Sequence, residues 1–121
     1  MTEPQRALDN AALDSLRESV GDDPEFLAEL VDDFLADAPA QLASLRETAT
    51  SGDAIGARRA AHTLKGNSRT FGAALLASRC QEVEAAADVG DLDAVVSRVD
   101  EIDQEWARVR AELVAVRDGQ A

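Results

Sequence analysis

Residues 24–50 read PEFLAELVDDFLADAPAQLASLRETAT, and their hydrophobic positions recur at steps of three and four. These positions are Phe26, Leu27, Leu30, Val31, Phe34, Leu35, Leu42 and Leu45. Such spacing places them on one face of an α-helix and predicts a long amphipathic helix with a buried stripe. Pro39 interrupts the segment, but the stripe continues in phase beyond it, so we expect a kinked helix rather than a break.

The same spacing predicts four further helices, over residues 8–20, 53–71, 73–89 and 91–117. Glycine and aspartate lie in the short turns between them, where they end one helix and cap the next. Short turns make consecutive helices antiparallel neighbours. The sequence therefore predicts an all-α fold, an antiparallel up-down four-helix bundle formed by the last four helices. Helix 8–20 is a short extra N-terminal helix lying over it, and residues 1–121 form a single domain.

The composition excludes several classes of partner. The net charge is −12, with 24 acidic and 12 basic residues, which argues against binding to nucleic acid or to an anionic membrane surface. No run approaches the roughly 18 apolar residues of a membrane span, and the N-terminus has no signal-peptide pattern. The single cysteine, Cys80, cannot form an internal disulfide. We expect a cytoplasmic protein that is monomeric because its like charges repel.

His62, the only histidine, lies in the helix predicted over residues 53–71. Each helical residue advances by about 100°, and on this helix the small and apolar side chains gather on the side opposite His62. They are Ala57, Ala60, Ala61, Leu64, Ser68 and Phe71. The imidazole is therefore predicted to face solvent.

The residues that share the His62 face are mostly cationic. Within about 60° of His62 lie Arg58, Arg59, Lys65, Gly66 and Arg69. Four cations and a single carboxylate in this segment of a strongly acidic chain predict a local positive patch, which suits an anion that arrives at the imidazole. Gly66, one turn from His62, leaves open space there at a cost of about 1 kcal/mol in helix propensity.

Several runs of sequence resemble histidine-containing phosphotransfer (HPt) domains. The main one is Ala61-His62-Thr63-Leu64-Lys65-Gly66-Asn67-Ser68, with Gly72 ten residues after the histidine. The runs 21–26, 34–39, 51–53 and 90–92 are similar to the family's turns and helix starts. The resemblance implies a four-helix bundle without kinase activity of its own. Its histidine accepts a phosphoryl group from a receiver-domain aspartate and passes it to another receiver domain.

The resemblance also implies roles for individual residues. His62 is the phosphorylated residue, Lys65 contacts the phosphoryl oxygens, and Gly66 leaves room for the receiver's loops. Ser68 orients the histidine helix or bonds near the site, and Arg69 and Arg58 are further candidates for phosphate contact. Glu84 stands at a position that is often polar in the family, and whether it faces the site is left open. The resemblance implies no metal and no cofactor for this chain, because Mg²⁺ is expected only on the receiver.

The implied partners are response-regulator receiver domains and the receiver of a hybrid histidine kinase. Ile55, seven residues before His62, projects on the same face. Two interpretations remain open for it. Either the first helix covers Ile55 through Leu13 or Leu16, or these residues and Arg59 form a docking patch that the receiver buries.

Three alternatives compete with this interpretation. An enzyme lacks support, because there is no glycine-rich phosphate loop and only one histidine. A carboxylate-bridged metal bundle needs inward Glu-x-x-His pairs, but position 59 is arginine and His62 faces outward. A module of a larger sensor kinase, or an adaptor that binds receivers without relaying phosphate, stays open, although Met1 and the polar tail favour a stand-alone protein.

Overall fold

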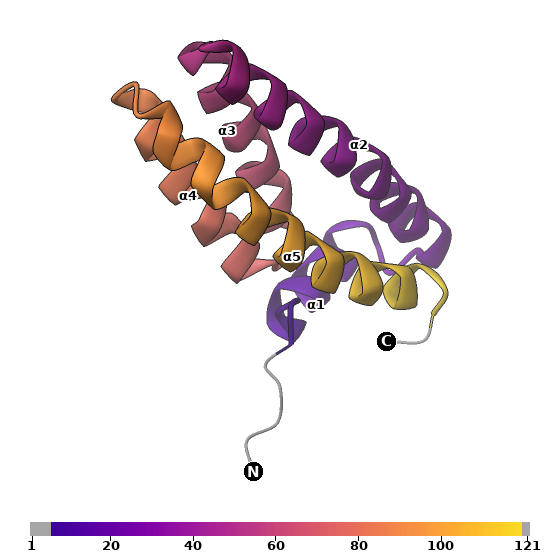
Figure 1. Cartoon of the computed structure of the whole chain (residues 1–121). Coiled ribbons are helices and arrows are strands. Elements are labelled where there is room, and N and C mark those ends of the chain that lie inside the picture. Colours follow the sequence, from indigo (N-terminus) through magenta and orange to yellow (C-terminus); the bar gives the residue numbers. More distant parts are fainter. Residues whose placement is uncertain (1–5, 120–121) are drawn as a thin grey trace.

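The computed structural model describes residues 6–119, and all regular structure within them is helical (Figure 1). The helices are α1 (Asn10–Ser19), α2 (Pro24–Ser51), α3 (Ala54–Thr70), α4 (Ala74–Asp88) and α5 (Leu92–Arg117). Each begins and ends within one or two residues of the range expected from the sequence. The four-helix bundle with an extra N-terminal helix is confirmed. The expected domain over 1–121 also includes residues 1–5 and 120–121, which lie outside the described residues.

Aspartate side chains start four of the five helices. Asp9, Asp23, Asp53 and Asp91 each accept a hydrogen bond from a backbone N–H in the first turn of the helix that follows, which satisfies donors that have no partner within the helix. α2 continues through Pro39 without a break, as its hydrophobic stripe predicted. No helix in the described part of the chain is long and apolar enough to cross a membrane.

The four long helices pack as a ring in which α2 contacts α3 and α5, and α4 contacts the same two helices. Three aromatic rings, from α2, α5 and the α3–α4 turn, lie at the centre of the core: Phe34 stacks on Phe71 at 5.0 Å and meets the edge of Trp106 at 5.2 Å. Cys80 is fully buried, as its place on the hydrophobic side of α4 predicted. Burial raises the pKa of its thiol to about 12, so the reactive thiolate is suppressed.

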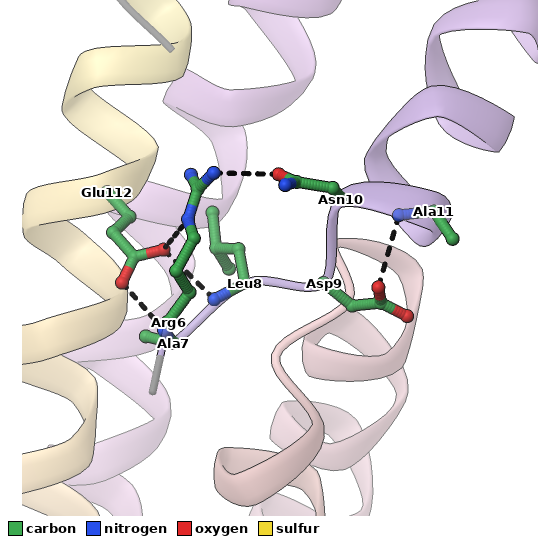
Figure 2. Close-up of polar contacts among 7 residues, drawn as sticks. All are labelled: Arg6, Ala7, Leu8, Asp9, Asn10, Ala11 and Glu112. Atoms are coloured by element: carbon green, nitrogen blue, oxygen red, sulfur yellow. Dashed lines mark hydrogen bonds and ion pairs between the residues drawn. The ribbon is translucent and has the colours of Figure 1, made fainter. Parts of the chain in front are cut away.

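α1 lies against the end of the bundle where α3 turns into α4 (Figure 1). The backbone N–H of Asp9 donates to the carbonyl of Gly72 at 2.9 Å. Figure 2 shows how α5 holds the segment that precedes α1: the Glu112 carboxylate accepts the N–H groups of Ala7 and Leu8 at 2.6 and 3.0 Å. Leu8 and Leu13 then bury their side chains in the core. α1 is therefore held at the end of α3 that precedes Gly72, and not at the other end of that helix.

Gly72 tests this placement of α1. Its φ is +75°, and an added Cβ would lie 2.7 Å from the Cβ of Ala12 and 3.0 Å from the carbonyl oxygen of Asp9. Gly90 has the same φ but open space around it, so it is a matched control. We expect Gly90→Ala to lose about 1–2 kcal/mol of stability from the left-handed backbone alone. Gly72→Ala should lose roughly 1–3 kcal/mol more because α1 must shift. Equal losses in urea-unfolding experiments would contradict the packing of α1 on this turn.

Candidate functional site

His62 lies in the middle of α3 and turns its side chain to solvent, with 66% of that side chain exposed. The residues expected on the opposite face are all buried: Ala57, Ala60, Ala61, Leu64, Ser68 and Phe71. The outward direction of His62, which the helical phase predicts, is therefore confirmed. Ser68 donates its hydroxyl to the carbonyl oxygen of Leu64 at 2.7 Å. It lies in the core and not beside the imidazole, so its contribution is to the helix and not to the site.

The Glu84 carboxylate of α4 joins His62 to Lys65. Its Oε1 lies 3.0 Å from His62 Nδ1, and its Oε2 lies 2.5 Å from the Lys65 ammonium. Lys65 also donates to the side-chain carbonyl of Gln81 at 3.0 Å. Gln81 and Glu84 are three residues apart on α4 and therefore share the face that packs on α3. The sequence left the direction of Glu84 open and gave no role to Gln81, and the structure places both at the site.

The charge of Glu84 determines which ring nitrogen is free. Burial raises the pKa of the Glu84 carboxyl, but contacts with the Lys65 ammonium and the His62 ring outweigh that effect and hold the pKa below its usual range. The group is therefore ionised near neutral pH and can only accept hydrogen bonds. His62 must then donate from Nδ1–H. In the neutral ring the lone pair is then on Nε2, the nitrogen that Glu84 does not contact.

The burial of Lys65 differs from what the sequence predicts. Helix phase placed it beside His62 on an open cationic face, but the residue is only 8% exposed. Its position about 60° from His62 points it toward α4, where Glu84 and Gln81 hold the ammonium. The contact of Lys65 with phosphoryl oxygens stays a prediction, and in this structure the ammonium is paired with the carboxylate instead.

The remaining residues of the predicted cationic face are exposed. Arg59 and Arg69 are solvent-exposed on α3. Arg58 is exposed as well and lies 4.0 Å from the carboxylate of Asp88 on α4. An added Cβ at Gly66 would meet nothing within 4 Å. The surface next to His62 is thus both open and bordered by guanidinium groups, as the sequence predicted.

The predicted docking residues do not lie together. Ile55 is in the first turn of α3 and is 67% exposed, whereas α1 packs at the far end of that helix, against Gly72. The 17 residues of α3 separate the two ends by about 25 Å. Leu13 is buried, and Leu16 is partly buried against the core. The interpretation in which the first helix covers Ile55 is therefore wrong, and so is the inclusion of Leu13 and Leu16 in a patch with Ile55, because α1 sits over the α3–α4 turn. Docking of a receiver on Ile55 and Arg59 stays a prediction.

Comparison with known proteins identifies relatives of this bundle. The Hpt domain family matches residues 29–112. Among solved structures, the chain is similar to histidine-containing phosphotransfer protein B (HptB) from Pseudomonas aeruginosa PAO1, with a TM-score of 0.86 and 35% sequence identity. That similarity covers 95% of this chain and 97% of the other. No curated protein sequence gives a significant match.

This bundle with a histidine on the outside of α3, taken with the two matches above, defines the class as a phosphoryl-carrying module. The chain belongs to the Hpt domain family, as its motifs indicated. Its function is histidine phosphotransfer in a two-component phosphorelay, in which Hpt domains work with response-regulator receiver domains.

The coupling between Glu84 and Lys65 predicts a pH-dependent stability. Because the pKa of Glu84 is depressed in the folded state, its stabilising contribution is present above the unfolded-state value and is lost as the pH falls through the folded value. We expect Glu84→Gln to cost roughly 1–3 kcal/mol at pH 7, since the buried Lys65 ammonium loses its carboxylate.

The cost of Glu84→Gln should shrink as the pH falls below about 4.3, the ordinary value for glutamate, because protonated Glu84 resembles glutamine. Denaturant unfolding of both proteins from pH 3 to pH 7 measures the difference. A cost that does not change with pH would show that the carboxylate charge has no part in it. Glu47→Gln, on the outer face of α2, is the matched control and should show no such convergence.

Proposed function

We propose that His62 is the residue that carries the phosphoryl group, on Nε2. The supporting observation is the contact between Nδ1 and the Glu84 carboxylate, which occupies the inner nitrogen and leaves the outer one toward solvent. The open surface at Gly66 supports the approach of a large partner. The donor is a receiver-domain phosphoaspartate, and the acceptor is the aspartate of a second receiver domain.

The transfer step follows from this arrangement. The Nε2 lone pair attacks phosphorus, the P–N bond forms, and the P–O bond of the acyl phosphate breaks, so that the aspartate leaves as a carboxylate. The proton on Nδ1 stays in place, and the ring becomes cationic during the attack. Glu84, at 3.0 Å, stabilises that charge and keeps the ring oriented. The reverse sequence of bond changes delivers the phosphoryl group to the next receiver.

Charge on this chain complements the group that is transferred. The guanidinium groups of Arg58, Arg59 and Arg69 border His62 and favour the approach of a phosphorylated partner, while Lys65 offsets the nearby carboxylate. Positioning and charge stabilisation are the main requirements of phosphoryl transfer. The chain itself then needs no cofactor and no kinase activity, and Mg²⁺ belongs to the receiver. The receiver of a hybrid histidine kinase is one partner. A monomeric cytoplasmic protein fits this role.

His62→Gln should abolish phosphorylation. Glutamine has no ring nitrogen to attack phosphorus, yet its amide can still donate to Glu84, so the melting temperature should change little. Labelling is measured with receiver domains of the source organism that carry radioactive phosphoaspartate, and the product should be acid-labile and stable in alkali. Thr63→Gln, at the exposed neighbouring position, is the matched control and should label like the wild type. Persistent labelling of His62→Gln would exclude His62 as the acceptor.

Gly66→Gln should separate docking from folding. Removing a mid-helix glycine adds up to about 1 kcal/mol of stability, and the longer side chain projects into open space beside His62. We expect receiver affinity to fall at least fivefold in titration calorimetry, because the side chain obstructs the approach. Gly66→Ala is the control, with a somewhat larger gain in helix propensity and little obstruction. If both variants bound the receiver as the wild type does, Gly66 would not define the approach surface.

A further inference from the structure

Arg69 is an exposed cation on the same face of α3 as His62, and nothing in the described part of the chain pairs with it. It makes no hydrogen bond and no ion pair with any described residue, although the chain has 24 acidic and only 12 basic residues. Other arginines are held differently: Arg46 and Arg117 each bind two carboxylates. A guanidinium left without a carboxylate in so acidic a chain is available to an anion from outside.

The lysine that the resemblance assigned to the phosphoryl oxygens is engaged elsewhere. Lys65 is only 8% exposed, and its ammonium lies 2.5 Å from Glu84 and donates to Gln81 at 3.0 Å. If the ammonium moved to a phosphoryl group, the Glu84 carboxylate would lose its counter-ion at a largely buried position, which is costly. A cation other than Lys65 can bind the phosphoryl group without that cost.

The geometry of α3 directs Arg69 toward His62. The two residues are seven positions apart, so they lie within about 20° of each other around the helix and about 10 Å apart along it. Long side chains in a helix lean toward its N-terminus. Arg69 therefore leans toward His62, whereas Arg58 and Arg59, which precede the histidine, lean away from it. In the turn between, Gly66 has no side chain, and an added Cβ would meet nothing within 4 Å.

A purely structural role for Arg69 is also available. The residue lies in the last turn of α3, where a positive charge is favourable at the end of the helix. That role requires only the charge of the side chain, and it acts on stability rather than on chemistry at His62. Lysine supplies the same charge without the forked donors of arginine, so the two roles are separable by experiment.

We propose that Arg69 extends over the bare turn at Gly66 and binds the phosphoryl oxygens at His62, while Lys65 stays paired with Glu84. The inference rests on the proposed function, since it names a further residue for that same transfer. During transfer the charge of the phosphoryl group is spread over three oxygens. A guanidinium presents two parallel donors that match two of these oxygens, which an ammonium does not.

The test labels the full chain with phosphoramidate, a small donor that needs no docking surface. Nε2 of His62 attacks phosphorus, the new P–N bond forms, and ammonia leaves. Arg69→Gln should be labelled at least about fivefold more slowly than the wild type, because a charge-assisted contact is lost. Arg69→Lys should be slower than the wild type at an unchanged melting temperature. Arg59→Gln and Arg110→Gln remove exposed arginines that have no ion pair among the described residues, and both should be labelled at the wild-type rate.

A double-mutant cycle tests whether Arg69 acts across Gly66. Gly66→Gln fills the turn between the two side chains, so it should slow labelling by itself. Adding Arg69→Gln should then slow it little further, because the contact is already blocked. In ³¹P NMR the phosphoryl group of the wild type should take up its proton at a lower pH than that of Arg69→Gln, since a bound guanidinium favours the dianion.

Three results would overturn the inference: labelling of Arg69→Gln at the wild-type rate, an equal loss of rate in Arg59→Gln, or losses that simply multiply in the double mutant. Each of these leaves phosphorylation of His62 intact. A wild-type chain that neither phosphoramidate nor a phosphorylated receiver labels would instead overturn the proposed function itself.

Discussion

The carboxylate of Glu84, shared between a ring nitrogen and a buried ammonium, is the contact on which the site depends. One oxygen fixes the tautomer and the orientation of His62, and the other is held by Lys65. An ionised carboxylate that is only 15% exposed would be costly by itself. Lys65 provides the opposite charge that keeps Glu84 ionised, and Gln81 accepts a hydrogen bond from Lys65 and fixes its position. The His62 ring is thus positioned by a chain of contacts that begins in the interior between α3 and α4.

That contact requires α3 and α4 to pair in one register, and the turn between them sets it. The turn is short, its glycine has a φ of +75°, and the backbone of Asp9 hydrogen-bonds to the carbonyl of Gly72. Glu112 on α5 in turn holds the segment before Asp9 by two backbone N–H groups (Figure 2). α1 therefore supports the register of the two helices that build the site, although it lies more than two helical turns from His62.

The helices and the outward direction of His62 could be predicted because both depend on one helix at a time. Apolar spacing and aspartate caps determine where each helix begins and ends. The helical phase of α3 is enough to place His62 on the opposite face of that helix from Ala60 and Leu64. Contacts between helices could not be predicted in this way. The burial of Lys65 depends on how closely α4 approaches its side of α3, and the aim of Glu84 depends on the register after Gly72. The position of α1 was missed for the same reason, since no pattern in residues 8–20 specifies which end of α3 it covers.

The distribution of charge resolves a conflict that the chemistry creates. Fixing the tautomer requires a hydrogen-bond acceptor at Nδ1, which here is a carboxylate, and a carboxylate without a counter-ion would repel a phosphoryl group that arrives at the other side of the ring in the proposed transfer. At separations of several ångströms and an effective dielectric near 20, such a repulsion amounts to a few kcal/mol. Pairing with Lys65 cancels the charge of Glu84 locally, so the incoming anion meets a neutral pair bordered by exposed arginines. The buried lysine therefore serves the site through its charge, whether or not its ammonium ever touches a phosphoryl oxygen.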